Sequence, residues 1–426
     1  VHLNNGAILQ VNGGLRIDAG ATLSHNTGSV SYLNVSGKFV LYGTYTQNAN
    51  GRITFNKGAI DTIAGNSTVT IARVYIDKTG SNRVVLDPAT DLSITDYLML
   101  LNSSLELVNS DLLLQPWAKI YSSVSLDTAL NTFNANKCII NSGSSSDPLL
   151  GGRVIRLFPN TLSLPQDFIF PIGTPGYYSP AKITLRASGA TFSTSPEISI
   201  KPVDKEHPKV EVNNKSLFKY WVVDTKDVTI NSNGANVEFY YNAGEVTGNE
   251  SNYKVLLYAP SYNNSAGYWR VDPGNDNDIV DFSLKFFYSI KVDTIQGDWL
   301  AGEPDVSEAT YYSRQNGDWD DPNTWSKVNF GGPASTTIPN KLSDRVRIKD
   351  DTVTIDAAPA AVKLISVEGG TNPGKLIITG NYALQGDSTI IEDGAVLAFQ
   401  HQDGISALPS TAGCIKTNKR SLSSNA

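Results

Sequence analysis

Hydrophobic and polar residues alternate in short runs through the first third of the chain. The stretch "GAILQVNGGLRIDAGATL" is the clearest case, because Leu9 and Val11 fall on one face of an extended chain, and Leu15 and Ile17 do so again after the turn residues NGG. Period-two alternation between turn residues is the pattern of β-strands. The same pattern recurs in "YLNVSG", "GRITFNKG", "STVTIARVYID", "NRVVLDP" and "SLELVNSDLLLQP".

These predicted strands are short, and many of the turns between them are not hairpin pairs. Many successive short strands with Asn and Gly at the corners are typical of a parallel β-helix, in which each coil buries its inward residues against its neighbours. We therefore predict a β-solenoid over 1–136, with a meandering antiparallel sandwich as the alternative. The segment "ATDLSITDYLMLLNSS" also fits a helical face, but its Ser, Thr and Asp content favours strands.

The pattern changes after a Gly- and Ser-rich junction at 137–152, "KCIINSGSSSDPLLGG". The runs become longer and more aromatic, as in "LFKYWVVD", "ANVEFYYNAG" and "VDFSLKFFYSIKV". Evenly spaced strands without intervening helices predict an antiparallel β-sandwich over 153–304, of immunoglobulin-like or jelly-roll type, as one domain or two. Trp221 and Trp269 lie within its strand patterns, so we expect both in the core.

The solenoid pattern returns near the end of the chain, in "DRVRIKDDTVTIDAA" and "GKLIITGNYALQGDSTIIEDGAVLAF". We predict a linker and solenoid cap over 305–343, a second β-solenoid over 344–412, and a junction toward a next repeat over 413–426. The predicted fold is all-β, with parallel β-helix segments alternating with a sandwich.

The two cysteines suggest a long internal repeat. "KCIINSG" contains Cys138 and "GCIKTNK" contains Cys414, and each follows a solenoid segment and leads toward a Ser-rich stretch. Two cysteines make neither a disulfide scaffold nor a zinc-finger spacing. We interpret the two places as one junction seen twice, and the chain as a window of a tandem array. Chance similarity is the alternative.

Composition and charge exclude some functions. The chain of 426 residues has a net charge of −7, which argues against nucleic acid as a partner, since phosphate binding needs clustered Lys and Arg. The nearest basic cluster, Lys416, Lys419 and Arg420, is interpreted as a solvated tail. No apolar run reaches the roughly 20 residues that span a bilayer. The chain starts at Val1 without a signal peptide, so we read it as a mature product or a fragment.

Several motifs resemble those of very large, repetitive cell-surface proteins of Bacteroidetes-type bacteria. The motifs are "YYSRQNGDWDDPNTWS", "GGTNPGKLIITGNYAL", "FIFPIGTPGYYSPAKITL", "FKYWVV" and "GDWLAGE". Proteins of this kind are exported by the type IX secretion system and include gliding-motility adhesins. The resemblance implies an extracellular, non-enzymatic segment of an adhesin or surface fibre that projects a binding tip from the cell. Its partners would be neighbouring modules of the same chain, the secretion or cell-surface machinery, and glycans.

Motifs for catalysis are missing from the sequence. The four histidines are scattered, and no HExxH, GxSxG, P-loop or GxGxxG motif occurs. We predict no catalytic residue and no cofactor. One loop, "DPGNDNDIVD", brings Asp272, Asp276 and Asp278 close together, which suits a structural calcium ion. Its spacing is not that of an EF-hand, and an exposed polar hairpin turn is the preferred interpretation.

The stretch "TYYSRQNGDWDDPNTWS" carries the aromatic residues Tyr311, Tyr312, Trp319 and Trp325. Exposed aromatic rings stack on sugars, so a glycan site is one interpretation. The other is a cap over the open end of the second solenoid, whose apolar surface and strand edges must be covered. We favour the cap and expect both tryptophans to be buried.

The sequence supports three further expectations, on modification, alternative function and assembly. By resemblance to O-glycosylated Asp-Ser/Thr-apolar sequences of such bacteria, Thr62, Thr128, Thr294 and Thr352 are candidates for glycosylation. The alternative function is a carbohydrate-binding or polysaccharide-acting β-helix protein. A third interpretation is a subunit that assembles into a filament through its solenoid ends and sheet edges.

Overall fold

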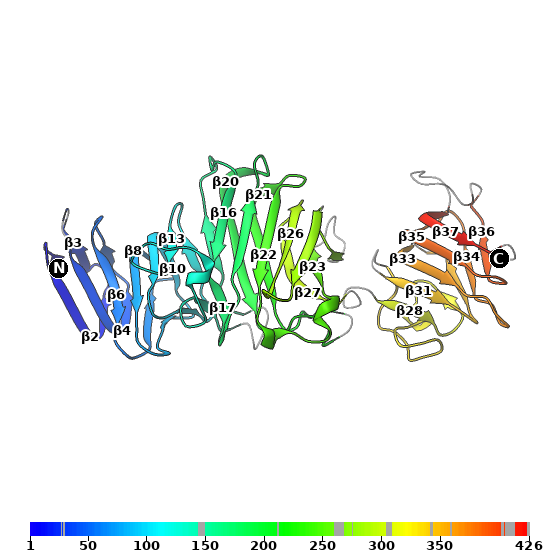
Figure 1. Cartoon of the computed structure of the whole chain (residues 1–426), viewed down its shortest axis with the longest axis horizontal. Helices are drawn as coiled ribbons and strands as arrows, with labels where there is room; N and C mark the ends of the chain where they lie inside the picture. Colours follow the sequence, from blue (N-terminus) through cyan, green and yellow to red (C-terminus); the bar gives the residue numbers. More distant parts are fainter. Residues whose placement is uncertain are drawn as a thin grey trace. The chain divides into compact units, whose positions relative to one another are not determined.

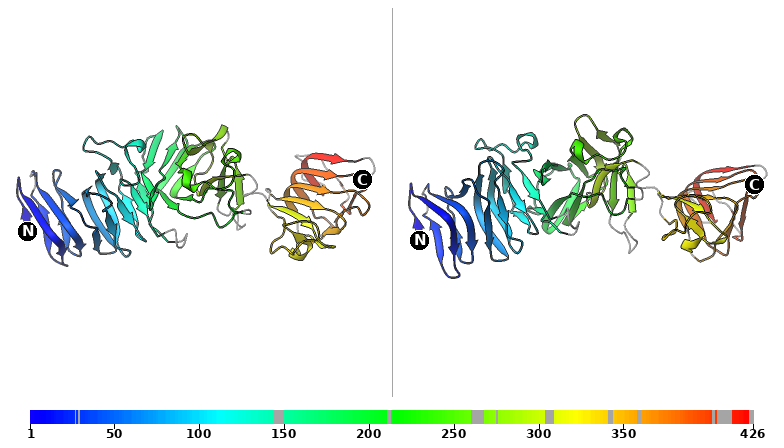
Figure 2. Two further views of the ribbon diagram at one scale, coloured as in Figure 1. Left: turned by 60° about the horizontal axis from the view of Figure 1, so that its bottom comes forward. Right: turned by 90° about the horizontal axis from the view of Figure 1, so that it is seen from below.

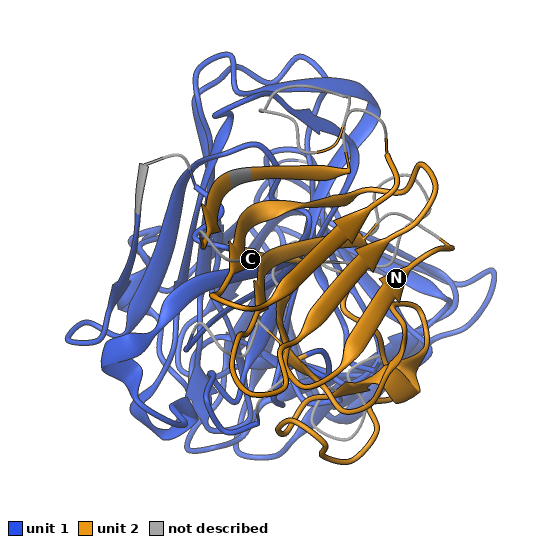
Figure 3. Cartoon of the chain, turned by 90° about the vertical axis from the view of Figure 1, so that its right-hand side faces the viewer, with its two compact units in different colours: residues 1–209, 213–267, 271–303 blue, residues 210–212, 268–270, 304–426 orange. Residues whose placement is uncertain are grey.

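The computed structural model describes residues 1–26, 28, 30–143, 150–210, 213–259, 268–274, 276–303, 309–340, 344–357, 360–401, 404 and 414–423. The described residues form strands and short 3-10 turns (Figure 1). They divide into two compact units, shown in different colours in Figure 3. Unit 1 comprises 1–209, 213–267 and 271–303, and unit 2 comprises 304–426 with the short stretches 210–212 and 268–270. None of the described helices has the length and hydropathy that a membrane crossing requires.

Unit 1 begins with a parallel β-solenoid, as predicted. Its strands are β1 (His2–Leu3), β2 (Ile8–Ile17), β3 (Thr22–His25), β4 (Tyr32–Leu41), β5 (Thr44–Thr46), β6 (Arg52–Asn56), β7 (Asp61–Gly65), β8 (Thr68–Asp77), β9 (Val84–Leu86), β10 (Asp91–Leu100), β11 (Leu105–Leu107), β12 (Leu112–Leu114), β13 (Lys119–Tyr121) and β14 (Ile139–Asn141), with the 3-10 turn η1 (Leu130–Thr132). The segment with an ambiguous helical pattern is strand β10.

Successive coils pair in parallel register, so that alternate side chains of each strand stack along the inside of the solenoid. Val11 of β2 lies beside Val35 of β4, and Ile71 of β8 lies beside Ile94 of β10. The inward residues, such as Leu33, are fully buried. Alternation with period two places every second side chain on the same face, which is why the sequence pattern produces this core.

The solenoid continues directly into the sandwich. Strand β12 pairs in parallel with β15 (Val154–Leu157), and β14 pairs in parallel with β17 (Ile172–Thr174). Strand β15 then pairs antiparallel with β20 (Ala190–Val203), so solenoid and sandwich share one 19-stranded sheet. Figure 2 shows the blue-to-cyan coils passing into the green strands. The predicted junction 137–152, of which 144–149 lies outside the described residues, therefore joins the two parts through backbone hydrogen bonds.

The remaining strands of the sandwich complete its two sheets. They are β16 (Gln166–Phe170), β18 (Tyr177–Tyr178), β19 (Ala181–Leu185), β21 (Tyr220–Ile230), β22 (Ala235–Tyr240), β23 (Lys254–Ala259), β24 (Tyr268–Val271), β25 (Asp276–Asp281), β26 (Phe286–Val292) and β27 (Gly297–Gly302), with the 3-10 turns η2 (Ala243–Glu245) and η3 (Glu250–Asn252). The second sheet has the order β16-β19-β22-β26-β25. Trp221 packs between the sheets against Phe239 and Phe287, and Trp269 is also buried, so both are core residues as expected.

Unit 2 is a second parallel solenoid with a core of its own. Its elements are β28 (Thr310–Ser313), β29 (Gly317–Asp318), η5 (Pro322–Thr324), β30 (Trp325–Ser326), β31 (Arg345–Ile348), β32 (Thr352–Ile355), β33 (Ala360–Val367), β34 (Lys375–Ile378), β35 (Leu384–Ile391), β36 (Val396–Phe399) and β37 (Ile415–Leu422). Two sheets, β30-β28-β31-β33-β35-β37 and β29-β32-β34-β36, enclose the core. Residues 309–340, which fall in the predicted linker and cap, supply its first strands.

Two ion pairs lie inside unit 1. In the solenoid, Lys78 Nζ lies 2.6 Å from Asp61 Oδ2, and both side chains are fully buried. The other oxygen of Asp61 accepts a hydrogen bond from the Gly37 amide at 2.6 Å. In the sandwich, the buried Lys219 ammonium pairs with Glu245 and donates to Thr174 and Ser179. Each buried charge here has an opposite charge as its partner, as burial in a low dielectric requires.

The Lys78–Asp61 pair gives a stability prediction. Lys78→Met leaves the Asp61 carboxylate buried without its counter-ion, so unfolding of unit 1 should require about 3–5 kcal/mol less free energy. Chemical denaturation followed by circular dichroism measures this difference. The double variant Lys78→Met/Asp61→Asn should recover part of the loss. Arg16→Met is the control, because its pair with Asp18 lies on the surface, with side chains 64% and 67% exposed, and should leave the midpoint unchanged. A Lys78→Met midpoint equal to that of the control would contradict the prediction.

Candidate functional site

The aromatic stretch 310–326 forms the beginning of unit 2 rather than an open surface. Trp319 is 5% exposed and Trp325 is fully buried, and their rings meet edge to face at 5.1 Å. Each indole nitrogen donates to a backbone carbonyl, Trp319 to Pro339 at 2.8 Å and Trp325 to Trp319 at 2.9 Å. The expected burial of both tryptophans is confirmed.

The polar residues of this stretch build its turns. The Asp321 side chain accepts a hydrogen bond from the Asn323 amide at 2.9 Å and so begins η5, with Pro322 at its first position. Strand β30 pairs antiparallel with β28 at the edge of its sheet. Tyr311 is buried, and Tyr312 packs against Phe330 at 5.1 Å. These contacts suit the predicted cap, which stays a prediction, and they place three of the four aromatic rings in the interior, with Tyr312 half-buried.

The predicted calcium loop has other partners. Asp272 Oδ2 lies 3.1 Å from Lys254 Nζ, and Asp278 accepts hydrogen bonds from the Gly274 amide at 2.9 Å and the Ser289 hydroxyl at 2.8 Å. The side chain of Asp276 lies outside the described residues. Throughout the described part of the chain, no three His, Cys, Asp or Glu residues gather as metal ligands. Calcium binding therefore stays an untested expectation.

The predicted glycosylation threonines are all half-buried. Thr62 lies in β7 and Thr352 in β32, whereas Thr128 and Thr294 lie outside strands. The hydroxyl of Thr294 accepts a hydrogen bond from the Gln296 amide at 3.1 Å. Their modification remains a prediction. Thr128 lines the pocket described next.

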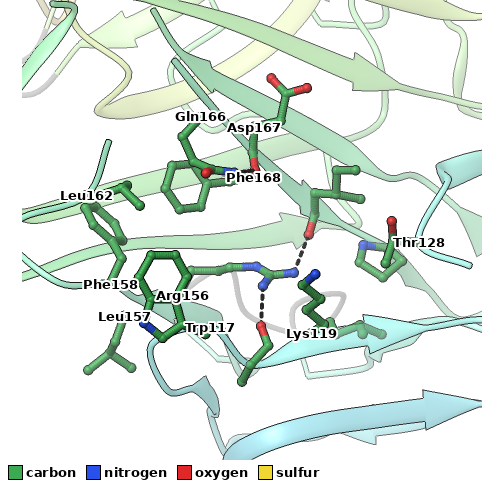
Figure 4. Close-up of a pocket in the computed structure, with 14 residues that line it drawn as sticks. Trp117, Lys119, Thr128, Arg156, Leu157, Phe158, Leu162, Gln166, Asp167 and Phe168 are labelled. Carbon is green, nitrogen blue, oxygen red and sulfur yellow. Dashed lines mark hydrogen bonds between the residues drawn. The ribbon is translucent and has the colours of Figure 1, made fainter. Parts of the chain in front are cut away.

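A pocket lies where the solenoid meets the sandwich, and we call it the junction pocket. It has a volume of about 260 Å³. The solenoid contributes Trp117, Ala118, Lys119, Ile120 and Thr128, and the sandwich contributes Arg156, Leu157, Phe158, Leu162, Gln166, Asp167, Phe168, Ile169 and Pro171. Figure 4 shows these side chains around Arg156.

Arg156 is held in the pocket by the main chain. Its Nη1 donates to the Ala118 carbonyl at 2.9 Å and its Nη2 to the Ile169 carbonyl at 3.0 Å, the two dashed lines of Figure 4. Its Nε is buried and has no hydrogen-bond partner among the described residues. Burial lowers the pKa of Arg156 to about 10, so the guanidinium keeps its charge at neutral pH.

The one carboxylate at the pocket is already paired. Asp167 Oδ2 lies 2.9 Å from Lys182 Nζ, and its Oδ1 accepts a hydrogen bond from Thr184 at 2.7 Å. Burial acts to raise the pKa of Asp167, but these two partners hold it below its ordinary value. A glycoside hydrolase of the usual kind needs two carboxyl groups flanking the scissile bond. Among the described residues that line the junction pocket, Asp167 is the one carboxylate.

Trp117 stands at the rim on a strained turn. The Ala118 amide donates to the Gln115 carbonyl at 2.9 Å, which closes a turn with Pro116 and Trp117 at its centre. Trp117 has a φ of 74°, and its side chain is 70% exposed. Proline followed by a residue with positive φ makes a type II turn, where glycine is the favoured second residue. A bulky residue in this conformation marks strain, which is often found at functional sites.

Sequence reasoning overlooked both residues, although each had a signal. The dipeptide Pro116-Trp117 between two strand patterns is a turn signal with an unusual second residue. Arg156 follows Val154 by two positions in a strand pattern, so alternation places it on the core face. The sequence could not show that these two residues, 39 positions apart (156 − 117), line one pocket.

Comparison of the chain with protein-family models, with curated proteins and with solved structures finds no match. The fold is an all-β solenoid joined to an antiparallel sandwich, and a function has to be proposed from that architecture and the pocket.

The strain at Trp117 gives a second prediction. Trp117→Gly removes an exposed side chain and relieves the positive φ, so unit 1 should become more stable by about 0.5–1 kcal/mol. Urea denaturation measures the shift. Leu126→Gly is a matched control, because Leu126 is 54% exposed, has a φ of 60° and does not line the pocket. A similar gain is expected there. A loss of stability in Trp117→Gly would show that the indole packs against the fold.

Proposed function

We propose that the chain is a structural, non-enzymatic segment of a large extracellular adhesin or surface fibre. The observation that carries the proposal is the backbone ladder that passes from the solenoid into the sandwich through β12–β15 and β14–β17. Bending unit 1 at this junction would break main-chain hydrogen bonds and open a core that continues across it. A stiff element of this kind suits a spacer that holds a binding tip away from the cell.

A repeated local geometry supports the idea of alternating modules. Cys138 precedes β14 and Cys414 precedes β37, and both thiols are buried and free. The carbonyl of each cysteine accepts a hydrogen bond from the leucine that opens the strand of the preceding coil, Leu105 at 3.2 Å and Leu384 at 2.7 Å. The following isoleucines, Ile139 and Ile415, then pair in parallel with those same leucines.

We infer that the two cysteines are equivalent places in two solenoids. The same hydrogen bond recurs between other coils, as from Leu112 to Arg153, so the inference is supported mainly by the shared Cys-Ile sequence and by the burial of both thiols. In the proposed protein, neighbouring modules of the same chain are the main partners. The cell-surface and secretion machinery would bind the full-length surface protein.

The location can be tested on cells. Antibodies raised against the purified chain should label intact cells of the organism that encodes it, and brief protease treatment of those cells should remove the signal. An antibody to a cytoplasmic protein, tested in parallel, controls for lysis. Labelling that appears only after the cells are broken would contradict an extracellular role.

The stiffness can be tested by calorimetry of the full chain. Because the shared sheet couples solenoid and sandwich, we expect two unfolding transitions, one for each unit. Trp325→Ala, which removes a buried core side chain of unit 2, should lower one of them only and so assign it. A third transition, with the first solenoid melting apart from the sandwich, would contradict the coupling.

A further inference from the structure

Arg156 occupies a core-facing position of the shared sheet. Its direct neighbours on the adjacent strands are Leu114 of β12 and Ile198 of β20, and both are fully buried. Paired residues on neighbouring strands point to the same side of a sheet. A cation therefore stands where the sheet otherwise presents aliphatic side chains, and the junction pocket opens beside it.

The charge of Arg156 is not neutralised by the described part of the chain. Its hydrogen bonds go to two neutral carbonyls, and Asp167, the carboxylate at the pocket, is paired with Lys182. In Figure 4 the Asp167 carboxylate points away from the guanidinium. The two lysines of unit 1 that are fully buried, Lys78 and Lys219, each have a carboxylate partner. Arg156 is half-buried and its Nε is fully buried, so an anion from outside would give this partly desolvated charge a partner.

The rim adds a second cation and a sugar-stacking surface. Lys119 is exposed and forms no ion pair among the described residues. Trp117 presents its indole to solvent at the cost of backbone strain. The other five tryptophans of the chain are at most 5% exposed. Flat aromatic rings with an apolar face and a polar edge suit the faces of sugar rings.

We propose that the junction pocket binds an acidic sugar, a uronic acid residue of a polysaccharide, with its carboxylate on Arg156 and its ring against Trp117. Arginine is suited to carboxylates because its planar fork donates in fixed directions. Lys119 and Gln166 supply further donors at the rim. The volume of about 260 Å³ is below the range of drug-sized ligand sites, roughly 300–1,000 Å³, and so suits a single sugar unit. This inference does not depend on the structural role proposed above.

The test uses the full chain and a panel of oligosaccharides of glucuronic, galacturonic, mannuronic and guluronic acid, each with its carboxyl-reduced counterpart. Calorimetry measures affinity, and protection of tryptophan fluorescence from acrylamide reports the pocket, because Trp117 is the exposed tryptophan. At least one acidic oligosaccharide should bind about tenfold or more tighter than its reduced form and protect the fluorescence. A panel without binding, or with equal binding of both forms, overturns the proposal.

A control with sodium acetate tests whether the carboxylate alone is enough for binding. Sodium acetate, at the concentrations of the oligosaccharides, should neither bind measurably nor protect Trp117. If acetate competes as well as the sugar does, the pocket is a simple anion site, and the sugar assignment fails.

Variants locate the site. Trp117→Gly should weaken binding of the acidic oligosaccharide about tenfold, whereas Leu126→Gly, matched in strain and exposure, should bind as the unchanged chain does. Arg156→Met should remove the preference for the acidic over the reduced form, and Arg156→Lys should keep part of it because the charge remains. If Arg156→Met does not fold, the Trp117→Gly and Leu126→Gly pair still decides the outcome. Equal binding by those two variants would overturn the assignment.

Discussion

The structure depends on one constraint: every coil of a parallel solenoid has backbone N–H and C=O groups that only another strand can satisfy. Within each solenoid, the next coil satisfies them, as β4 does for β2 and β33 does for β31. The last coil at the end of a solenoid has no further coil, so other strands must satisfy its backbone hydrogen bonds. In unit 1 the last coils pair with the sandwich, β12 with β15 and β14 with β17, so the sheet continues beyond the solenoid. In unit 2 the first coil is edged by the antiparallel strand β30 and packed with Trp319 and Trp325.

The same geometry makes polar side chains at inward-facing positions unusual. Inward positions of the coils are lined by Leu, Ile, Val and Phe, and a polar group there must find a partner. Asp61 has Lys78, and Glu245 has Lys219. Arg156 donates to two main-chain carbonyls, its Cζ lies 5.9 Å from the centre of the Phe170 ring, and its Nε has no hydrogen-bond partner among the described residues.

The strained turn at Trp117 points to the same place by a different argument. A positive φ strains the backbone of a bulky residue such as tryptophan, whereas glycine adopts it without strain. The chain keeps tryptophan at this position, and the indole lies mostly in solvent. Two unfavourable features lie at the junction pocket: a half-buried cation that forms no ion pair with the described residues, and an exposed aromatic residue on a strained backbone. Their occurrence at the same pocket supports the proposal that this pocket binds a ligand.

The sequence by itself determined the strands, their all-β class, the order of solenoid, sandwich and solenoid, and the burial of Trp221, Trp319 and Trp325. These follow from period-two alternation and turn residues, which each short segment carries locally. Only the tertiary structure decided that β12 pairs with β15, that Cys138 and Cys414 each precede a strand that pairs with the coil before it, and that Arg156 and Trp117 line one pocket. Parallel pairing joins strands that are separated in the chain, so the residues of one strand do not identify the strand with which it pairs. Whether a buried charge has a partner also depends on all the side chains that packing brings around it, and no single stretch of sequence contains that answer.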